Sequence, residues 1–246
     1  MSEVLFEVFG VNITISAGYG VVSVIVLLLF MSLWLAGRKK RSDREIFAGQ
    51  VMNGIGFGLL PALAVLKAFQ VMSGGAGAKV FEPLPTLQWM TENGCFLPCR
   101  IEMSATILAF LLLCLWLIVR KGDMPDNGDL LMISVCIWAA IRLITENLRS
   151  EPRDMFRYAS ACTMMACMII WEVRRARSFR VPGRTIAEMM AAGICIGIHL
   201  VTVKGLLTAG SDIGDFAVKT GSALLLLLLT LMVGGDVRKS MRPEKS

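Results

Sequence analysis

The stretch ALLLLLLTLMV at residues 223–233 decides the class of fold, because it contains six consecutive leucines and no charge. It closes a longer apolar segment, residues 217–233, and the basic residues Arg238, Lys239 and Arg242 follow. A helix of about 20 predominantly apolar residues spans the hydrocarbon core of a bilayer. The segment therefore predicts a transmembrane helix with a basic end.

Six further apolar segments precede this one. They are residues 19–36, 46–72, 101–119, 130–148, 155–171 and 186–207. The composition agrees with a membrane protein, since 55% of the 246 residues are hydrophobic and only 18% are charged, against roughly 25% charged residues in soluble domains. We therefore expect an all-α, polytopic membrane protein that forms one integral membrane domain, residues 1–246, with about seven transmembrane helices.

The basic residues predict the orientation of these helices. Sixteen of the 25 Lys and Arg residues fall in four groups, within residues 38–44, 120–121, 174–184 and 238–245. Cytoplasmic loops carry an excess of Lys and Arg. All four groups lie inside if the N-terminus is outside and the C-terminus inside. Acidic Glu3 and Glu7 are not typical of a signal peptide, and no basic face alternates with aromatic residues, so we expect no nucleic-acid partner.

One predicted helix carries a stripe of charge. In IWAAIRLITENLRSEPR, residues 137–153, the spacing of Arg142, Glu146 and Arg149 places all three on one helical face. A charged side chain within a membrane is costly unless it is paired or faces a polar cavity. Two guanidinium forks held by one carboxylate suit a lipid phosphate at the outer leaflet. The alternatives are a salt-bridge network that locks helices together and, for Arg149, a side chain that reaches the membrane surface.

Other polar residues of the predicted helices are secondary candidates. Arg100 and Glu102 begin the segment 101–119 on the outer side and are supporting candidates, as is Tyr19 at the outer end of the first helix. His199 and Lys204 lie together in the segment 186–207, which suggests proton or solute transport, or a buried histidine with a structural role. Five cysteines lie in apolar segments, where cysteine behaves as a small hydrophobe.

The two remaining cysteines, Cys95 and Cys99, lie at the end of the predicted loop of about residues 73–98. Their Cys-x3-Cys spacing is compatible with a disulfide if that loop is outside the cell. We expect no metal site, because the chain has a single histidine, far away in sequence, and we expect no cofactor.

Three stretches resemble the bacterial prolipoprotein diacylglyceryl transferases. AGYGVVSVIVLLLFMSLWLAGRKK, residues 17–40, is similar to the first helix of that family, and residues 97–121 are similar to its Pro-Ser-Gln-Leu-Tyr-Glu helix, with Glu102 at the Glu. IRLITENLRSEP, residues 141–152, resembles the family's Arg-x3-Glu-x2-Arg pattern ahead of a proline. The family's His-Gly-Gly and Gly-Arg-x-Gly-Asn-Phe motifs do not occur, so the resemblance is to a diverged member.

The resemblance implies a location and an activity. The family transfers diacylglyceryl from phosphatidylglycerol to the lipobox cysteine of a preprolipoprotein in the bacterial inner membrane, and Arg142 occupies the position of its phosphate-binding Arg. It implies a transferase-like core at about residues 10–180 and an added two-helix part at about residues 181–246. No residue is assigned as catalytic. The leading hypothesis is a diacylglyceryl-transferase-like protein that binds phospholipid through Arg142 and Arg149, and the alternatives are a non-catalytic scaffold or accessory subunit and a small-solute transporter.

Overall fold

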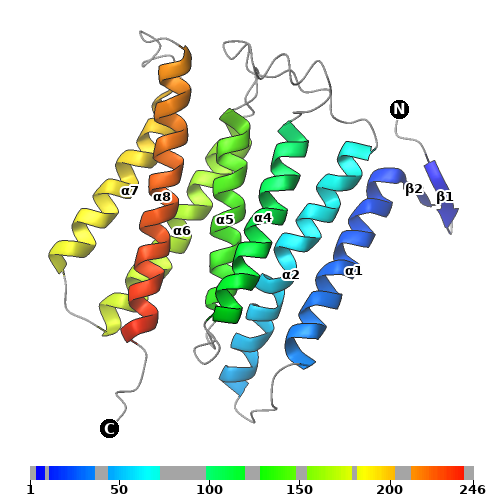
Figure 1. Cartoon of the computed structure of the whole chain (residues 1–246), viewed down its shortest axis with the longest axis horizontal. Helices are drawn as coiled ribbons and strands as arrows, with labels where there is room; N and C mark the ends of the chain where they lie inside the picture. Colours follow the sequence, from blue (N-terminus) through cyan, green and yellow to red (C-terminus); the bar gives the residue numbers. More distant parts are fainter. Residues whose placement is uncertain are drawn as a thin grey trace. The chain divides into compact units, whose positions relative to one another are not determined.

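The computed structural model describes residues 4–8, 11–36, 44–72, 98–119, 128–147, 154–178, 182–202 and 212–240. Within these ranges the chain forms seven helices and one two-stranded hairpin (Figure 1). The helices are α1 (Ile15–Ala36), α2 (Arg44–Met72), α4 (Pro98–Val119), α5 (Asp129–Asn147), α6 (Asp154–Ser178), α7 (Pro182–Thr202) and α8 (Asp212–Ser240). The fold is all-α apart from the hairpin, as the apolar segments predicted.

Each of the seven predicted segments is a helix, and most of the ends differ from the prediction by a few residues. The hairpin was not predicted. It pairs β1 (Val4–Val8) with β2 (Val11–Thr14) in antiparallel register, with Glu7 opposite Asn12. Apolar and polar residues alternate along β2, as they do on a strand with two unlike faces. The segment is too short to resemble the helical spans.

Among the described residues, four helices are long and apolar enough to cross a membrane, and several such spans in one chain indicate a multi-pass membrane protein. They are Gly18–Ala36, Phe47–Phe69, Arg100–Val119 and Ala217–Gly234. Large apolar side chains of α1, α4 and α8 are exposed at helical spacing, as on a face that meets lipid. On α4 these are Ile107, Leu108, Leu111, Leu112, Leu115 and Ile118. The other three described helices, α5, α6 and α7, are of similar length, but their described residues contain no stretch that is apolar enough by the same measure.

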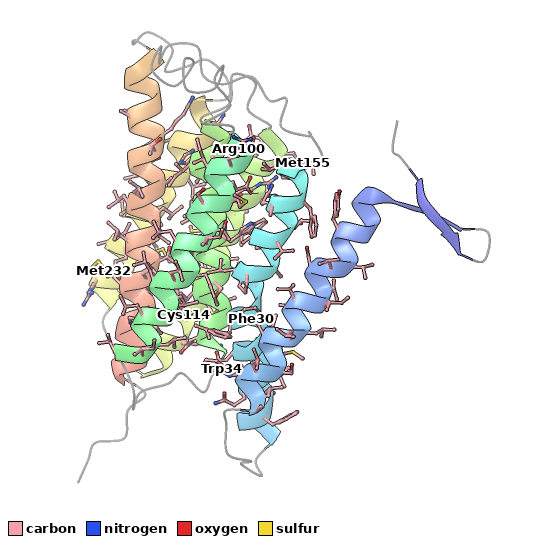
Figure 2. The ribbon with its side chains drawn as sticks, turned by 45° about the vertical axis from the view of Figure 1, so that its right-hand side comes forward. Phe30, Trp34, Arg100, Cys114, Met155 and Met232 are labelled. Carbon is pink, nitrogen blue, oxygen red and sulfur yellow. The ribbon has the colours of Figure 1, made fainter. Side chains whose placement is uncertain are left out.

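The described chain divides into two compact units. The first comprises residues 1–77 and 99–134, and the second comprises residues 78–98 and 135–246, so α5 begins in the first and continues in the second. In the first unit, aromatic rings of α1, α2 and α4 meet: Phe57 lies 5.8 Å from Phe30 and 5.5 Å from Phe110, centroid to centroid. Figure 2 labels Phe30 and Trp34 on α1. Trp34 donates its indole N–H to Gln50 Oε1 at 3.0 Å, which satisfies two buried polar groups.

Glycines allow the closest helix approaches of the first unit. A Cβ on Gly56 would lie 2.4 Å from the backbone of Leu131, and a Cβ on Gly58 would lie 2.7 Å from the carbonyl oxygen of Leu27. Small residues let membrane helices approach in this way. Asn53, three residues before Gly56 on α2, accepts a hydrogen bond from the N–H of Leu130 at 3.0 Å. This bond satisfies a backbone donor in the first turn of α5.

The second unit packs α6, α7 and α8 with the remainder of α5. Trp171 of α6 is fully buried, and its ring approaches the backbone of Gly234 on α8 so closely that a Cβ there would lie 2.9 Å away. Most side chains of α5 are buried; they include Cys136, Ala139, Ala140, Leu143 and Thr145. Since protein rather than lipid surrounds this helix, it can carry polar side chains that a lipid-facing helix could not.

Candidate functional site

Arg142 lies in the second unit, on α5, between two aromatic rings. Its guanidinium carbon lies 4.4 Å from the ring centroid of Phe156 on α6 and 5.9 Å from that of Trp138, one turn earlier on α5. The side chain is buried, with 8% of the residue exposed. A cation within about 6 Å of an aromatic face is attracted by the ring quadrupole, more strongly when water is excluded. Both rings therefore attract the buried guanidinium, the ring of Phe156 at the shorter distance.

Glu146 provides a negative charge close to Arg142. It is fully buried and one turn further along α5, with Oε1 4.0 Å from Arg142 Nη2. This confirms the predicted common face of Arg142 and Glu146. The distance exceeds that of a hydrogen bond, so Glu146 compensates charge at short range without forming a close fork with these atoms. The carboxylate lowers the cost of burying Arg142 and belongs to the same helix.

Such an arrangement suits the recognition of an anion. A guanidinium stacked on an aromatic face presents its N–H groups at its planar edge, where a phosphate or carboxylate is bound in two parallel hydrogen bonds. Exclusion of water strengthens every charge interaction in the site. The described part of the chain contains no group of three or more His, Cys, Asp or Glu residues placed to bind a metal ion.

Several predicted residues fall outside this site or outside the described residues. Arg149, Lys204 and Cys95 lie outside the described residues, as does the side chain of Cys99. The five cysteines of the apolar segments are free thiols, in agreement with their predicted role as small hydrophobes.

Glu102 has a partner that the sequence analysis did not assign. In the first unit, its Oε2 lies 3.0 Å from Nζ of Lys67, and both side chains are buried. The pair joins α4 to α2, whereas Arg100 is exposed. Tyr19, the other supporting candidate, stacks its ring on Phe69 of α2 at 4.4 Å with the rings nearly parallel. Glu102 and Tyr19 thus contribute to helix packing within the first unit.

His199 lies in a second polar cluster of the second unit, which spans three helices. Its Nε2 is 2.9 Å from Oγ of Ser222 on α8, and the charges of Arg157 on α6 and Lys219 on α8 act on its ring. Both His199 and Arg157 are buried. Arg157 was not among the predicted site residues, although it is a charge within the apolar segment 155–171, the same signal that identified Arg142.

Comparison with known proteins found no matching family model, no matching curated protein and no matching solved structure. The resemblance to the diacylglyceryl transferases therefore stays a prediction. The site itself supplies the argument for function.

Proposed function

We propose that this chain is a diacylglyceryl-transferase-like membrane protein that binds anionic phospholipid, phosphatidylglycerol in particular, through Arg142. One observation supports the proposal most strongly: a buried guanidinium is held between the rings of Trp138 and Phe156 in a chain with four apolar spans. Burying a charge in such a protein costs several kcal/mol. A bound lipid phosphate would offset part of that cost by pairing with the guanidinium. Arg149 would be a second cation for the same headgroup.

The proposal includes a location. With seven crossings, N-outside and C-inside, the basic groups of the sequence face the cytoplasm and the C-terminal half of α5 faces the outer leaflet. We assign the chain to a bacterial inner membrane, where phosphatidylglycerol and preprolipoproteins meet. In this orientation Arg142 lies about four residues, or roughly 6 Å, above the midpoint of the 19-residue helix α5.

The reaction proposed is transfer of diacylglyceryl to a lipobox cysteine of a preprolipoprotein. A bond forms between the cysteine sulfur and the carbon of the diacylglyceryl group that carried the phosphate. The bond between that carbon and its phosphate oxygen breaks, and the thiol proton leaves with the headgroup as glycerol phosphate. Arg142 would stabilise the negative charge that develops on the departing phosphate. General base catalysis contributes about 10² to 10⁴ in rate, and no residue of this chain is assigned to that role.

The alternative is a non-catalytic scaffold in which Arg142 and Glu146 are structural. Complete burial of Glu146 beside Arg142 favours it. However, the two residues are four apart on one helix, and an ion pair within a helix does not join that helix to another. Arg142 also lies close to the ring of Phe156 on α6, and a cation–π contact is a weaker restraint than an ion pair between helices.

Transfer and lipid retention, measured together, test the proposal. Purified wild type should transfer diacylglyceryl from phosphatidylglycerol to a lipobox peptide, and Arg142→Gln should abolish transfer and lower the phosphatidylglycerol that co-purifies. Arg184→Gln is the control, because it removes an arginine whose side chain is half exposed on α7, where it pairs with Glu188. Lack of transfer by wild type contradicts the enzyme; equal lipid retention by both variants, with a loss of thermal stability in Arg142→Gln alone, supports the scaffold.

A further inference from the structure

Two of the free cysteines in the second unit contact each other. Cys136 on α5 and Cys167 on α6 share a hydrogen bond between their thiols. Both residues are buried, with 0% of Cys136 and 7% of Cys167 exposed. A role as a small hydrophobe accounts for the burial of a cysteine, but it requires no contact between two thiols from separate helices. The pair is therefore a candidate for thiol chemistry.

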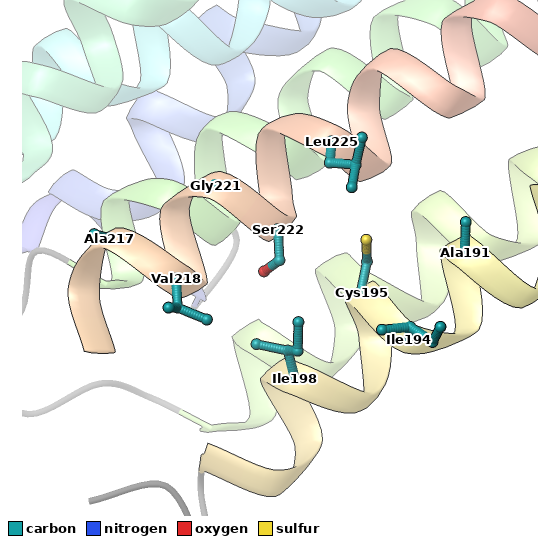
Figure 3. A pocket seen from close by; sticks show the side chains of 9 residues that line it. All are labelled: Ala191, Ile194, Cys195, Ile198, Ala217, Val218, Gly221, Ser222 and Leu225. Carbon is teal, nitrogen blue, oxygen red and sulfur yellow. The ribbon is translucent and has the colours of Figure 1, made fainter. Parts of the chain in front are cut away.

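Cys195 provides a contrast within the same unit. It lies on α7 among the residues that line an apolar groove beside α8, across from Ser222 (Figure 3). No second cysteine lines that groove. An oxidant that reaches Cys195 there meets one sulfur atom, whereas an oxidant that reaches the pair on α5 and α6 meets two sulfur atoms in contact.

The donor set around the pair does not suit zinc. Structural zinc takes four ligands from cysteine, histidine and carboxylate side chains. The part of the chain that the structure describes contains no group of three or more such residues placed to bind a metal ion. Formation of a disulfide needs only the two sulfur atoms that are already in contact, so this chemistry fits the pair better than zinc binding does.

The geometry leaves a short movement before a disulfide can form. The two sulfur atoms must come to about 2.05 Å from each other. A cysteine side chain is short, so a hydrogen bond between two thiols already holds the backbones of their helices close together. Ala139 and Ala140, buried on the next turn of α5, are small residues of the kind that let membrane helices approach.

Exposure gives the two cysteines different roles. Some surface of Cys167 is accessible and none of Cys136, so an oxidant reaches Cys167 first. When Cys167 is ionised, the thiol of Cys136 donates its hydrogen bond to the sulfur that must react. The oxidant has to be small and uncharged to reach a buried thiol among apolar helices, and hydrogen peroxide meets both conditions.

We propose that Cys136 and Cys167 are a redox-active pair that hydrogen peroxide oxidises to a disulfide between α5 and α6. The thiolate of Cys167 attacks one peroxide oxygen, a sulfenic acid forms, and the other oxygen leaves as water. The sulfur of Cys136 then displaces the hydroxyl of the sulfenic acid as a second water, and the sulfur–sulfur bond forms. In total, two thiols lose two electrons and two protons, and one peroxide becomes two waters.

The disulfide would close a loop of the chain from residue 136 to residue 167. This loop contains Arg142 and Phe156, so oxidation would tie together the two helices that place a ring beside the guanidinium. The inference uses no property of Arg142 and stands if the lipid role of that residue fails.

Peptide mapping of the full-length protein in detergent micelles tests the pair. The reduced protein is treated with hydrogen peroxide, its remaining thiols are blocked, and it is digested with trypsin. In wild type, the tryptic peptide of residues 122–142 should be linked to that of residues 158–174, and a reductant should separate them. Cys136→Ala and Cys167→Ala should each abolish this link.

Cys162→Ala is the matched control. Cys162 lies on the same helix and the same tryptic peptide as Cys167, but it is exposed. The variant should keep the link, as should Cys195→Ala. Loss of the link in Cys162→Ala and its retention in Cys167→Ala would overturn the assignment of the pair.

Two further measurements on wild type test the reaction itself. A link that forms only after the protein is unfolded would overturn the pair as a property of the fold. Oxidised glutathione, a charged peptide disulfide, should leave the folded protein unlinked, and linking as fast as with peroxide would overturn the small, uncharged oxidant. Neither result depends on whether Arg142→Gln retains lipid.

Discussion

The two units each contain a buried acid–base pair, and the pairs differ in kind. In the first unit, Lys67 and Glu102 join α2 to α4 with their charged atoms 3.0 Å apart. In the second unit, Arg142 and Glu146 lie on one helix with their charged atoms 4.0 Å apart, and aromatic rings flank the cation. A close pair between helices fixes packing. A looser pair within one helix does not by itself join two helices, and we propose that Arg142 binds lipid.

The largest effect is expected from breaking the pair of the first unit. Lys67→Met leaves the carboxylate of Glu102 buried without its lysine, and loss of one partner of a buried pair costs about 3–5 kcal/mol. The double variant Lys67→Met/Glu102→Leu should recover most of this loss, because it removes both charges. Unfolding in mixed detergent micelles measures the free energy of unfolding of the single variant and of the double variant. A loss below about 1 kcal/mol in Lys67→Met would show that the pair does not secure the packing of α2 and α4.

A smaller loss of unfolding free energy is expected where two helices of the first unit approach closely through their backbones. Gly56→Ala would place a Cβ 2.4 Å from the backbone of Leu131, and overpacking of this kind costs about 1–3 kcal/mol. Gly193→Ala, in open space on α7, should instead be neutral or stabilising by up to about 1 kcal/mol, because alanine favours a helix. The two unfolding free energies, compared in one detergent, check this. Equal stabilisation of both variants would contradict the close approach of α2 and α5.

The sequence was sufficient for the helices and for part of the site. The apolar segments locate the seven described helices, of which four are long and apolar enough to span a membrane, and helical periodicity alone places Arg142 and Glu146 on one face. Contacts between distant segments could not be predicted from the sequence, because periodicity carries no information about which helices are neighbours. The pairing of Lys67 with Glu102, 35 residues away, and the convergence of Arg157, His199 and Ser222 are of this kind. Arg157 was visible as a charge in an apolar segment; its partners were not.

The smallest effect is expected at the aromatic wall of the second unit. Phe156→Leu keeps an apolar side chain but removes the ring over Arg142, which should weaken phosphatidylglycerol binding by about 0.5–1 kcal/mol, or two- to fivefold. Phe69→Leu is the control in the first unit, since that ring stacks on Tyr19. It should leave lipid affinity unchanged. Equal affinities of the Phe156→Leu variant and wild type, by titration in micelles, would show that the ring does not position Arg142 for lipid.

The affinity of Arg142 variants for phosphatidylglycerol over phosphatidylcholine tests the central claim most directly. Native mass spectrometry of wild type, Arg142→Lys and Arg142→Gln, titrated with each lipid, gives this ratio. We predict a clear preference for phosphatidylglycerol in wild type, a reduced preference in Arg142→Lys, which keeps the charge but loses the planar fork, and a decrease of about tenfold or more in Arg142→Gln. The same preference in all three proteins would contradict the account, and Arg142 would then be a structural residue.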